Sequence, residues 1–134
     1  MCYVNREMGR RNSEALSSFG ITGAQLQTLV FVHRNAVQGK SVCQRDVERE
    51  LNLRASSVST MLSHLTSGGY ITRSYAEGDN RTKFIELTPK GEELCLKNRE
   101  LIDKCDEIIQ SALTDEERAL FQSLLLKIMK HLEN

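Results

Sequence analysis

One segment of the sequence combines a helical apolar stripe with an unusual polar face. In RASSVSTMLSHLTSGGYITR, which begins at Arg54, apolar residues recur at the spacing of an α-helix: Val58, Met61, Leu62 and Leu65. The opposite face carries mainly Ser and Thr, where ordinary surface helices carry Lys and Glu. Short hydroxyl side chains let a helix approach another surface closely and offer hydrogen bonds, as entry into a DNA major groove requires. The polar candidates on this helix are Arg54, Ser56, Ser57, Ser59, Thr60, Ser63 and His64.

A second candidate is the charged stretch EGDNRTKFIELTPKG at residues 77–91. Gly78 permits a turn between two β-rich runs, residues 70–75 and 82–87, so the pattern predicts a β-hairpin with a charged tip. Thr88 and Pro89 then favour a helix start, because Thr caps helix N-termini and Pro suits the first helical position. The sequence therefore predicts that a charged hairpin is joined directly to a helix.

Three helices are expected before the hydroxyl-rich one. The first ends at Gly20, and the second is capped by Thr22 and continues to about Asn35. A loop follows, and Ser41 with Gln44 has the spacing of a capping box at the start of the third helix. These short helices precede the hydroxyl-rich helix and the hairpin, which is the element order of a winged helix-turn-helix.

Two long helices with wide apolar faces are expected in the C-terminal part of the chain. One seam repeats every seven residues, at Leu94, Leu101 and Ile108. A capping box of Thr114 and Glu117 predicts the start of the final helix. This helix is predicted to bury Leu120, Phe121, Leu124, Leu125, Ile128 and Leu132. Because such faces exceed what one small domain needs, part of them is expected to contact a partner.

Three stretches of sequence carry a specific resemblance. GIT at residues 20–22 is similar to a Gly-Leu-Thr helix entry, and LNLRASSVSTMLSHLTSGGYITR is similar to a Leu-Gly-Leu, Ser/Thr, Val, Leu, Gly-Leu-Ile/Val, Arg pattern. DNRTKFIELTPKG contains Asp-x-Arg followed by Leu-Thr-x-x-Gly. In this order, from about Asn5 onward, the chain resembles the MarR family of transcriptional regulators. Arg54 and Glu48 depart from the family pattern, where a capping Ser or Thr and a small residue are usual.

The resemblance implies a mainly α fold with a small β-hairpin wing, an α+β class. A winged helix-turn-helix core would be flanked by N- and C-terminal dimerisation helices. Residues 1–134 would form one MarR-like domain, with the DNA-binding lobe at 22–91 and the helical dimerisation region at 1–20 plus 92–134. It also implies a homodimer on a pseudo-palindromic operator of double-stranded DNA, acting as a repressor that a small-molecule effector relieves.

The same resemblance implies roles for individual residues. On the recognition helix the hydroxyls would face bases or phosphates, while Arg54 and His64 would mostly meet phosphates. In the wing Arg81 would enter the minor groove, and Asp79 would orient it or pair with Arg73. The candidates in the wing are Arg73, Asp79, Arg81 and Lys83. The dimerisation candidates are Leu101, Ile108, Leu120, Leu124, Leu125 and Ile128.

The distribution of charge along the chain agrees with a DNA-binding part followed by a dimerisation part. The formal net charge is zero, but residues 1–91 carry 12 Lys and Arg against 8 Asp and Glu, while residues 92–134 carry 6 against 10. The basic part would face DNA, and the acidic part would form the dimer. No apolar stretch approaches the roughly 18 residues of a membrane span, and the N-terminus does not resemble a signal peptide. A cytoplasmic protein without membrane contact is expected.

Other classes of function have weaker support in the sequence. Ser, His and acidic residues do not form a catalytic pattern, so an enzyme is not expected, and neither a metal site nor a cofactor is predicted. The cysteines are widely spaced, at Cys2, Cys43, Cys95 and Cys105. Two alternatives remain open: a thiol-based redox-sensing regulator of the same fold, for which Cys2 is the nearest candidate, and a winged-helix protein-interaction module.

Overall fold

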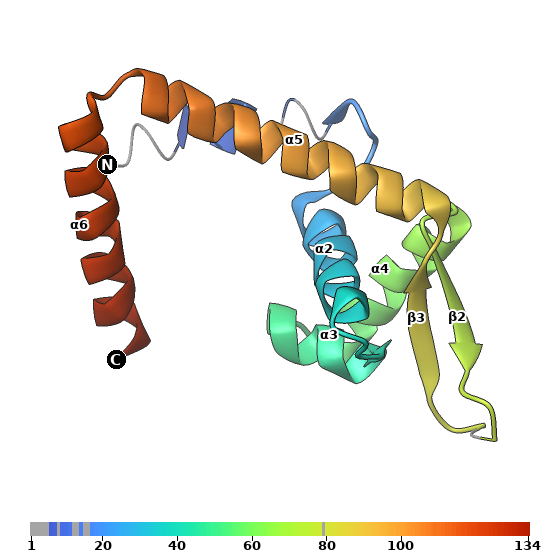
Figure 1. The fold of residues 1–134 in the computed structure, drawn as a ribbon. Helices are drawn as coiled ribbons and strands as arrows, with labels where there is room; N and C mark the ends of the chain where they lie inside the picture. Colours follow the sequence, from blue (N-terminus) through green and yellow to red (C-terminus); the bar gives the residue numbers. More distant parts are fainter. Residues whose placement is uncertain (1–5, 8, 12–13, 15–16, 79) are drawn as a thin grey trace. The chain divides into compact units, whose positions relative to one another are not determined.

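The computed structural model describes residues 6–7, 9–11, 14, 17–78 and 80–134. The chain divides into two compact units, Met1–Asn98 and Arg99–Asn134. The described residues up to residue 17 are helical. The first unit continues with helices α2 (Gly23–Val37), α3 (Gln44–Leu51) and α4 (Ala55–Ser67) and strands β1 (Val42–Cys43), β2 (Ile71–Tyr75) and β3 (Lys83–Leu87) (Figure 1). Helix α5 (Pro89–Ser111) starts in this unit and ends in the second, which also holds α6 (Asp115–Glu133).

Helix α2 begins at the predicted cap. The Thr22 hydroxyl oxygen accepts a hydrogen bond from the Gln25 N–H at 3.2 Å, and the Gln25 side chain accepts one from the Thr22 N–H at 2.9 Å. This reciprocal pair is a capping box. Gly20 has a φ of 70°, as expected for a glycine that follows a helix end. The helix continues to Val37, so its predicted end near Asn35 was too early.

The start of α3 differs from the prediction. Ser41 does not cap this helix; Cys43 precedes it, and the Asp46 carboxylate accepts hydrogen bonds from the Cys43 N–H at 2.9 Å and thiol at 3.2 Å. The predicted capping box of Ser41 and Gln44 was therefore wrong. The physical reason is strand pairing, because Val42 and Cys43 form β1 and keep the chain extended up to the helix.

The predicted hairpin is one part of a three-stranded antiparallel sheet with the order β1-β3-β2. In the hairpin Arg73 lies opposite Ile85, and Tyr75 lies opposite Lys83. Strand β1 pairs with the other edge of β3, where Val42 lies opposite Ile85. The mainly helical α+β class is confirmed, and the third strand is an addition to the prediction.

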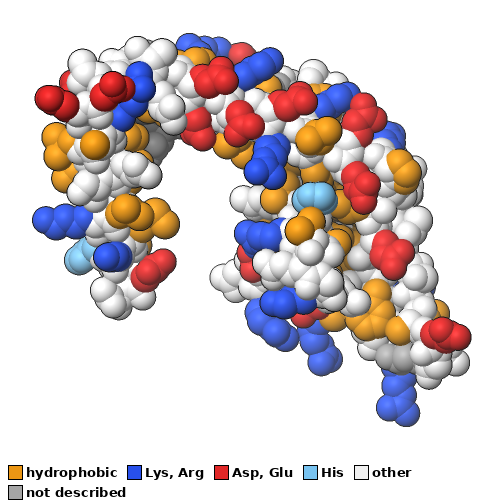
Figure 2. All heavy atoms as spheres, viewed as in Figure 1, with side chains coloured by type: hydrophobic (Ala, Val, Ile, Leu, Met, Phe, Trp, Pro, Cys, Tyr) orange, Lys and Arg blue, Asp and Glu red, His pale blue; other side chains and the backbone are white. Residues whose placement is uncertain are grey.

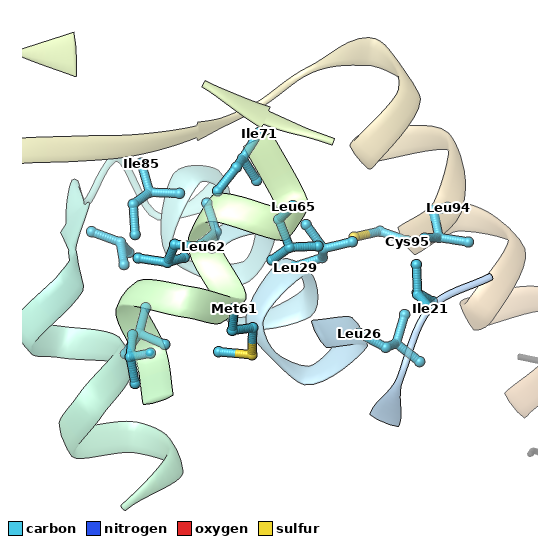
Figure 3. Close-up of a cluster of buried hydrophobic side chains, with 14 residues drawn as sticks. Ile21, Leu26, Leu29, Met61, Leu62, Leu65, Ile71, Ile85, Leu94 and Cys95 are labelled. Atoms are coloured by element: carbon cyan, nitrogen blue, oxygen red, sulfur yellow. The ribbon is translucent and has the colours of Figure 1, made fainter. Parts of the chain in front are cut away.

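The core of the first unit lies where α2, α3 and α4 meet the sheet (Figure 3). Leu29 and Val47 have no exposed surface. Thr28 is also fully buried, and its hydroxyl donates to the Ala24 carbonyl at 2.9 Å, so this polar group has a partner. The predicted buried stripe of α4 is confirmed at Val58, Met61, Leu62 and Leu65. Burial of this stripe fixes which face of α4 points outward.

The end of α4 is fastened to the start of α5. The Thr88 hydroxyl donates to the Gly69 carbonyl at 2.5 Å, and the Lys90 ammonium donates to the Gly68 carbonyl at 2.7 Å. The Thr88 hydroxyl oxygen also accepts from the Gly91 N–H at 3.2 Å, in agreement with its predicted role as the cap of α5. Side chains from α5 thus satisfy carbonyl groups at the C-terminus of α4.

Tyr70 extends the same joint. A Cβ atom on Gly91 would lie 2.2 Å from the Tyr70 carbonyl oxygen, which only a glycine avoids. The Tyr70 hydroxyl donates to the Phe19 carbonyl at 3.3 Å, and the Lys90 ammonium lies 4.5 Å from the centroid of the Tyr70 ring. Tyr70 therefore contacts both α5 and the segment that precedes α2.

The second unit has little core of its own. Helix α6 begins at the predicted capping box, in which the Thr114 hydroxyl oxygen accepts from the Glu117 N–H at 3.2 Å. All of α6 is described, and none of its residues is buried. The prediction that α6 buries its apolar face is therefore wrong for a single chain. The exposed side chains are Leu120, Phe121, Leu124, Leu125, Ile128 and Leu132.

Candidate nucleic-acid interface

The outer face of α4 presents its hydroxyl side chains to solvent. Every predicted contact residue of this helix is exposed: Arg54, Ser56, Ser57, Ser59, Thr60, Ser63 and His64. The Thr60 hydroxyl donates to the Ser56 carbonyl and the Ser63 hydroxyl to the Ser59 carbonyl, each at 3.0 Å. Since each of these hydroxyl oxygens keeps lone pairs, both can still accept a hydrogen bond from a partner. The face is polar, closely approachable and mostly uncharged.

The first turn of α4 is positioned from α3. The Gln44 side-chain amide donates to the Ala55 carbonyl at 3.2 Å, which links the two helices of the helix-turn-helix. Arg54 is the N-cap residue of α4, and its side chain makes no capping hydrogen bond. The first N–H groups of α4 therefore have no acceptor from this cap, and groups of this kind attract anions.

The hairpin forms a wing that exposes the cations Arg81 and Lys83 near its end. Gly78 has a φ of 78° in the turn, a conformation that favours glycine. Arg81 and Lys83 are exposed, and the Lys83 ammonium lies 5.3 Å from the centroid of the Tyr75 ring in a cation–π contact. Asp79 lies outside the residues that the structure describes, so its contact with Arg81 or Arg73 stays a prediction.

A groove of about 580 Å³ separates the wing from the first turn of α3. We name it the wing–α3 groove, and it is lined by Cys43, Gln44, Arg45, Arg73, Tyr75, Arg81, Thr82, Lys83 and Ile85. Figure 2 shows Lys and Arg side chains gathered over α3 and at the wing. Sequence reasoning found the wing cations but missed Gln44, Arg45 and Tyr75. A polar Gln-Arg pair in the helix before the recognition helix was the available signal.

The acidic group nearest to this first turn is already engaged. The Cys43 N–H donates to the Asp46 carboxylate and holds the pKa of that carboxyl below its usual range, against the opposing effect of burial. Asp46 lines a different groove, together with Arg49. Among the described ion pairs none includes Arg45, Arg73 or Lys83. Arg45, Arg73 and Lys83 thus bring positive charge to the wing–α3 groove outside the ion pairs of the described residues.

The predicted dimerisation residues lie on α5 and α6. Leu101 is half-buried, and the others are exposed: Ile108, Leu120, Leu124, Leu125 and Ile128. Exposed fractions of 42% for Leu125 and 49% for Leu124 are large for clustered Leu side chains. Apolar surface of this extent on a helix is typical of an interaction site.

Neither the thiols nor the possible metal ligands among the described residues form a second site. Cys43 and Cys105 are half-buried, Cys95 is buried, and all are free, while Cys2 lies outside the described residues. Burial, followed by the negative charge of Glu92, raises the pKa of Cys95 to about 11, which keeps its thiol protonated. Within the described part of the chain, His, Cys, Asp and Glu do not gather into a metal-binding group. The described helices include none that could span a membrane.

The order of elements and the exposed polar helix beside a cationic wing define a winged helix-turn-helix protein. Comparison with known sequences makes the class specific, because the profile of the MarR family matches residues 19–82. An uncharacterised HTH-type transcriptional regulator of Bacillus subtilis, YwhA, is 31% identical over 102 residues, which cover 73% of this chain and 70% of that relative. The chain belongs to the MarR family of transcriptional regulators.

Relatives of known structure agree over nearly the whole chain. MepR, a transcription regulator of the Staphylococcus aureus multidrug efflux pump MepA, is 27% identical with a TM-score of 0.83, covering 97% of this chain and 93% of MepR. A MepR–DNA complex is 28% identical with a TM-score of 0.81, covering 97% and 95% of the two chains. Among relatives compared by sequence alone, the HTH-type transcriptional regulator PecS of Dickeya dadantii is 24% identical over 131 residues, 98% of this chain and 78% of PecS.

Proposed function

We propose that the protein represses transcription as a homodimer bound to a pseudo-palindromic operator, and that a small ligand relieves this repression. The observation that carries the proposal is the exposed hydroxyl face of α4 beside a cationic wing on one compact unit. The similarity to MepR bound to DNA supports the same use of these elements. Under this proposal residues 22–91 form the DNA-binding lobe, and residues 1–20 and 92–134 form the dimerisation region.

Each part of the lobe has a distinct task in this proposal. The hydroxyls of α4 contact base edges and phosphates in the major groove, while Arg54 and His64 meet phosphates. Arg81 enters the flanking minor groove, whose negative potential attracts an Arg side chain. Arg73 and Lys83 add positive charge beside it. Phosphate contacts supply affinity, and the helix and Arg81 supply the preference for sequence.

The dimer follows from the uncovered apolar surface of α6. A second copy of the chain would cover the same side chains on its partner, because a two-fold interface is self-complementary. Two lobes held in this way would meet two half-sites related by two-fold symmetry. Leu120, Leu124, Leu125 and Ile128 would form the centre of this interface, with Leu101 and Ile108 contributing from α5.

Ligand relief has support from a relative and from one groove. A solved structure shows MepR bound to ethidium bromide. In this chain a groove of about 330 Å³ lies on the first unit, lined by apolar residues including Leu26, Val30 and Phe31 and edged by the Arg34–Glu50 ion pair at 3.2 Å. An aromatic ligand of modest size fits such a mixed surface.

Selection of bound sequences from a random pool of double-stranded DNA tests this function directly. A two-fold symmetric site is expected to be enriched, and Arg81→Ala is expected to weaken its binding roughly ten-fold or more while reducing the preference at flanking positions. Lys40→Ala, which removes an exposed charge outside the predicted contacts, serves as the control. If no sequence is enriched, the protein-interaction alternative gains the support that DNA binding loses.

A further inference from the structure

One face of the wing changes in chemistry along its length. Alternate residues of a strand point to the same face, so Ile71, Arg73 and Tyr75 share one face of β2. Ile85 and Lys83 lie opposite Arg73 and Tyr75, and their side chains share that face too. Ile71 and Ile85 are buried against the core. The same face therefore changes from apolar near the core to cationic toward the wing tip.

The opposite wall of the wing–α3 groove is the start of α3. Gln44 is the first residue of this eight-residue helix, and Arg45, the next residue, is exposed in its first turn. Arg73 is half-buried and Lys83 exposed on the facing wall, so cations from two separate elements border one groove. Asp46, the acidic residue of that turn, lines a different groove. Such an arrangement attracts a polyanion.

The place of the groove identifies the polyanion. Gln44 bonds to Ala55, the first residue of α4, so the groove adjoins the start of the recognition helix. Its other end reaches Arg81 near the wing tip. In B-DNA a sugar-phosphate strand separates each major groove from the adjacent minor groove. A duplex that receives α4 in one groove and Arg81 in the next must place this strand between them, where the wing–α3 groove lies.

We infer that the wing–α3 groove holds backbone phosphates of the strand between the two DNA grooves. Arg45 binds these phosphates from α3, and Arg73 and Lys83 bind them from the inner face of the wing. Arg73 and Lys83 then act on the backbone rather than on the minor groove, which is left to Arg81. This inference rests on the proposed DNA binding and adds α3 as a third contacting element.

Replacing Arg45 with Ala tests the inference on the intact protein and its selected operator. Arg45→Ala is expected to weaken binding about five- to twenty-fold for all sequences alike, and to lower the salt dependence by about two counterions per dimer, one for each Arg45 removed. The control is Arg49→Ala, which removes the same charge one turn later on α3, at an exposed residue lining the other groove. Arg49→Ala is expected to change affinity less than about two-fold.

A second measurement locates the contact on the DNA. A single methylphosphonate, which neutralises one phosphate between the two grooves, should weaken binding by the wild-type protein. The same substitution should cost less affinity for Arg45→Ala than for the wild-type protein, because one of the partner side chains is already absent. Thermal unfolding followed by circular dichroism checks that each variant is folded, and Arg45→Lys should recover part of the lost affinity.

The outcomes separate the inference from the function on which it rests. If the wild-type protein binds its operator and Arg45→Ala behaves like Arg49→Ala, the groove does not hold phosphates and only the inference fails. An altered base preference in Arg45→Ala would also overturn it, since a phosphate contact carries no sequence information. If the wild-type protein binds no DNA, the proposed function and the inference fail together.

Discussion

The two compact units solve the burial of apolar side chains in opposite ways. In the first unit Leu29, Val47 and Leu62 are fully buried within one chain by three helices and a small sheet. In the second unit α6 has a similar density of apolar residues, yet Leu124 is 49% exposed and Leu132 78% exposed. Helical periodicity thus identifies side chains that favour burial, but it does not identify what covers them.

The largest effect is expected from charging the uncovered face of α6. In the double variant Leu124→Asp and Ile128→Asp, each protomer would bury two carboxylates at the proposed interface. The dimer dissociation constant is expected to rise by at least about a thousand-fold, roughly 4 kcal/mol. Analytical ultracentrifugation over a range of concentrations measures this shift.

The matched control for this variant lies on the same helix. Gln122→Asp adds one negative charge at an already polar, exposed position, and is expected to leave the dissociation constant within a few-fold of the wild-type value. A wild-type protein that sediments as a stable monomer would contradict the dimer. Something other than a second copy of the chain would then have to account for the exposed apolar face of α6.

An intermediate effect is expected inside the first unit, at the joint between α4 and α5. Gly-to-Ala changes within helices usually stabilise a protein, by up to about 1 kcal/mol. Gly91→Ala should do the opposite and lower the free energy of unfolding by about 1–3 kcal/mol, because its Cβ would lie 2.2 Å from the Tyr70 carbonyl oxygen. Urea unfolding followed by circular dichroism measures the change.

Gly23→Ala is the control for this substitution. Gly23 is the first residue of α2, and a Cβ there would meet no atom within 4 Å. The free energy of unfolding of the Gly23→Ala variant is expected to equal that of the wild-type protein or to be slightly higher. Equal effects of the two substitutions would show that the close packing between Gly91 and Tyr70 does not limit the stability of the lobe.

The effect with the smallest consequence for folding and assembly concerns the reactivity of the thiols in the two units. In single-cysteine variants at pH 8, Cys95 should react with iodoacetamide far more slowly than Cys105, because burial raises the pKa of Cys95 to about 11. At that pH only about one Cys95 thiol in a thousand is ionised. The rate at Cys95 should rise as the pH increases toward 11, since the raised pKa delays formation of the thiolate.

Denatured protein is the control for thiol reactivity, since both cysteines should then react at similar rates. Rapid reaction of Cys95 in the folded protein at pH 8 would contradict its burial. It would also restore interest in a thiol-based signal in the first unit. Cys2 must be absent from both single-cysteine variants so that its reaction does not obscure the comparison.

Local signals in the sequence predicted much of the fold. The helix cap at Thr22, the capping box of Thr114 and Glu117 and the buried stripe of α4 depend on residues within one or two helical turns, so residue type and spacing alone predicted them. Strand β1 was not predictable in this way, because two residues show no periodicity and the strand exists only through pairing with β3. The same pairing displaced the predicted cap of α3 from Ser41.

In the candidate site too, local sequence signals predicted some residues and missed those that only tertiary pairing brings together. The hydroxyl face of α4 was predictable, since exposure follows from the stripe buried on the opposite side. Arg45 and Tyr75 were missed because no spacing relates them; they meet only after β3 pairs with both of its neighbours. Resemblance to a family supplied the prediction that Arg81 enters the minor groove, which helical or strand periodicity alone does not give.

The joint of Thr88 and Lys90 with the end of α4 also determines how far a tilt at the joint would displace the start of α4. Helix α4 has 13 residues, so at 1.5 Å per residue its start lies roughly 20 Å from the carbonyl groups that α5 holds. A tilt of about 10° at the joint would displace that start by about 3.5 Å, close to the 3.4 Å between successive nucleotides along one DNA strand. A rotation of this size at Thr88 would thus move the start of α4 by about the distance between two neighbouring nucleotides.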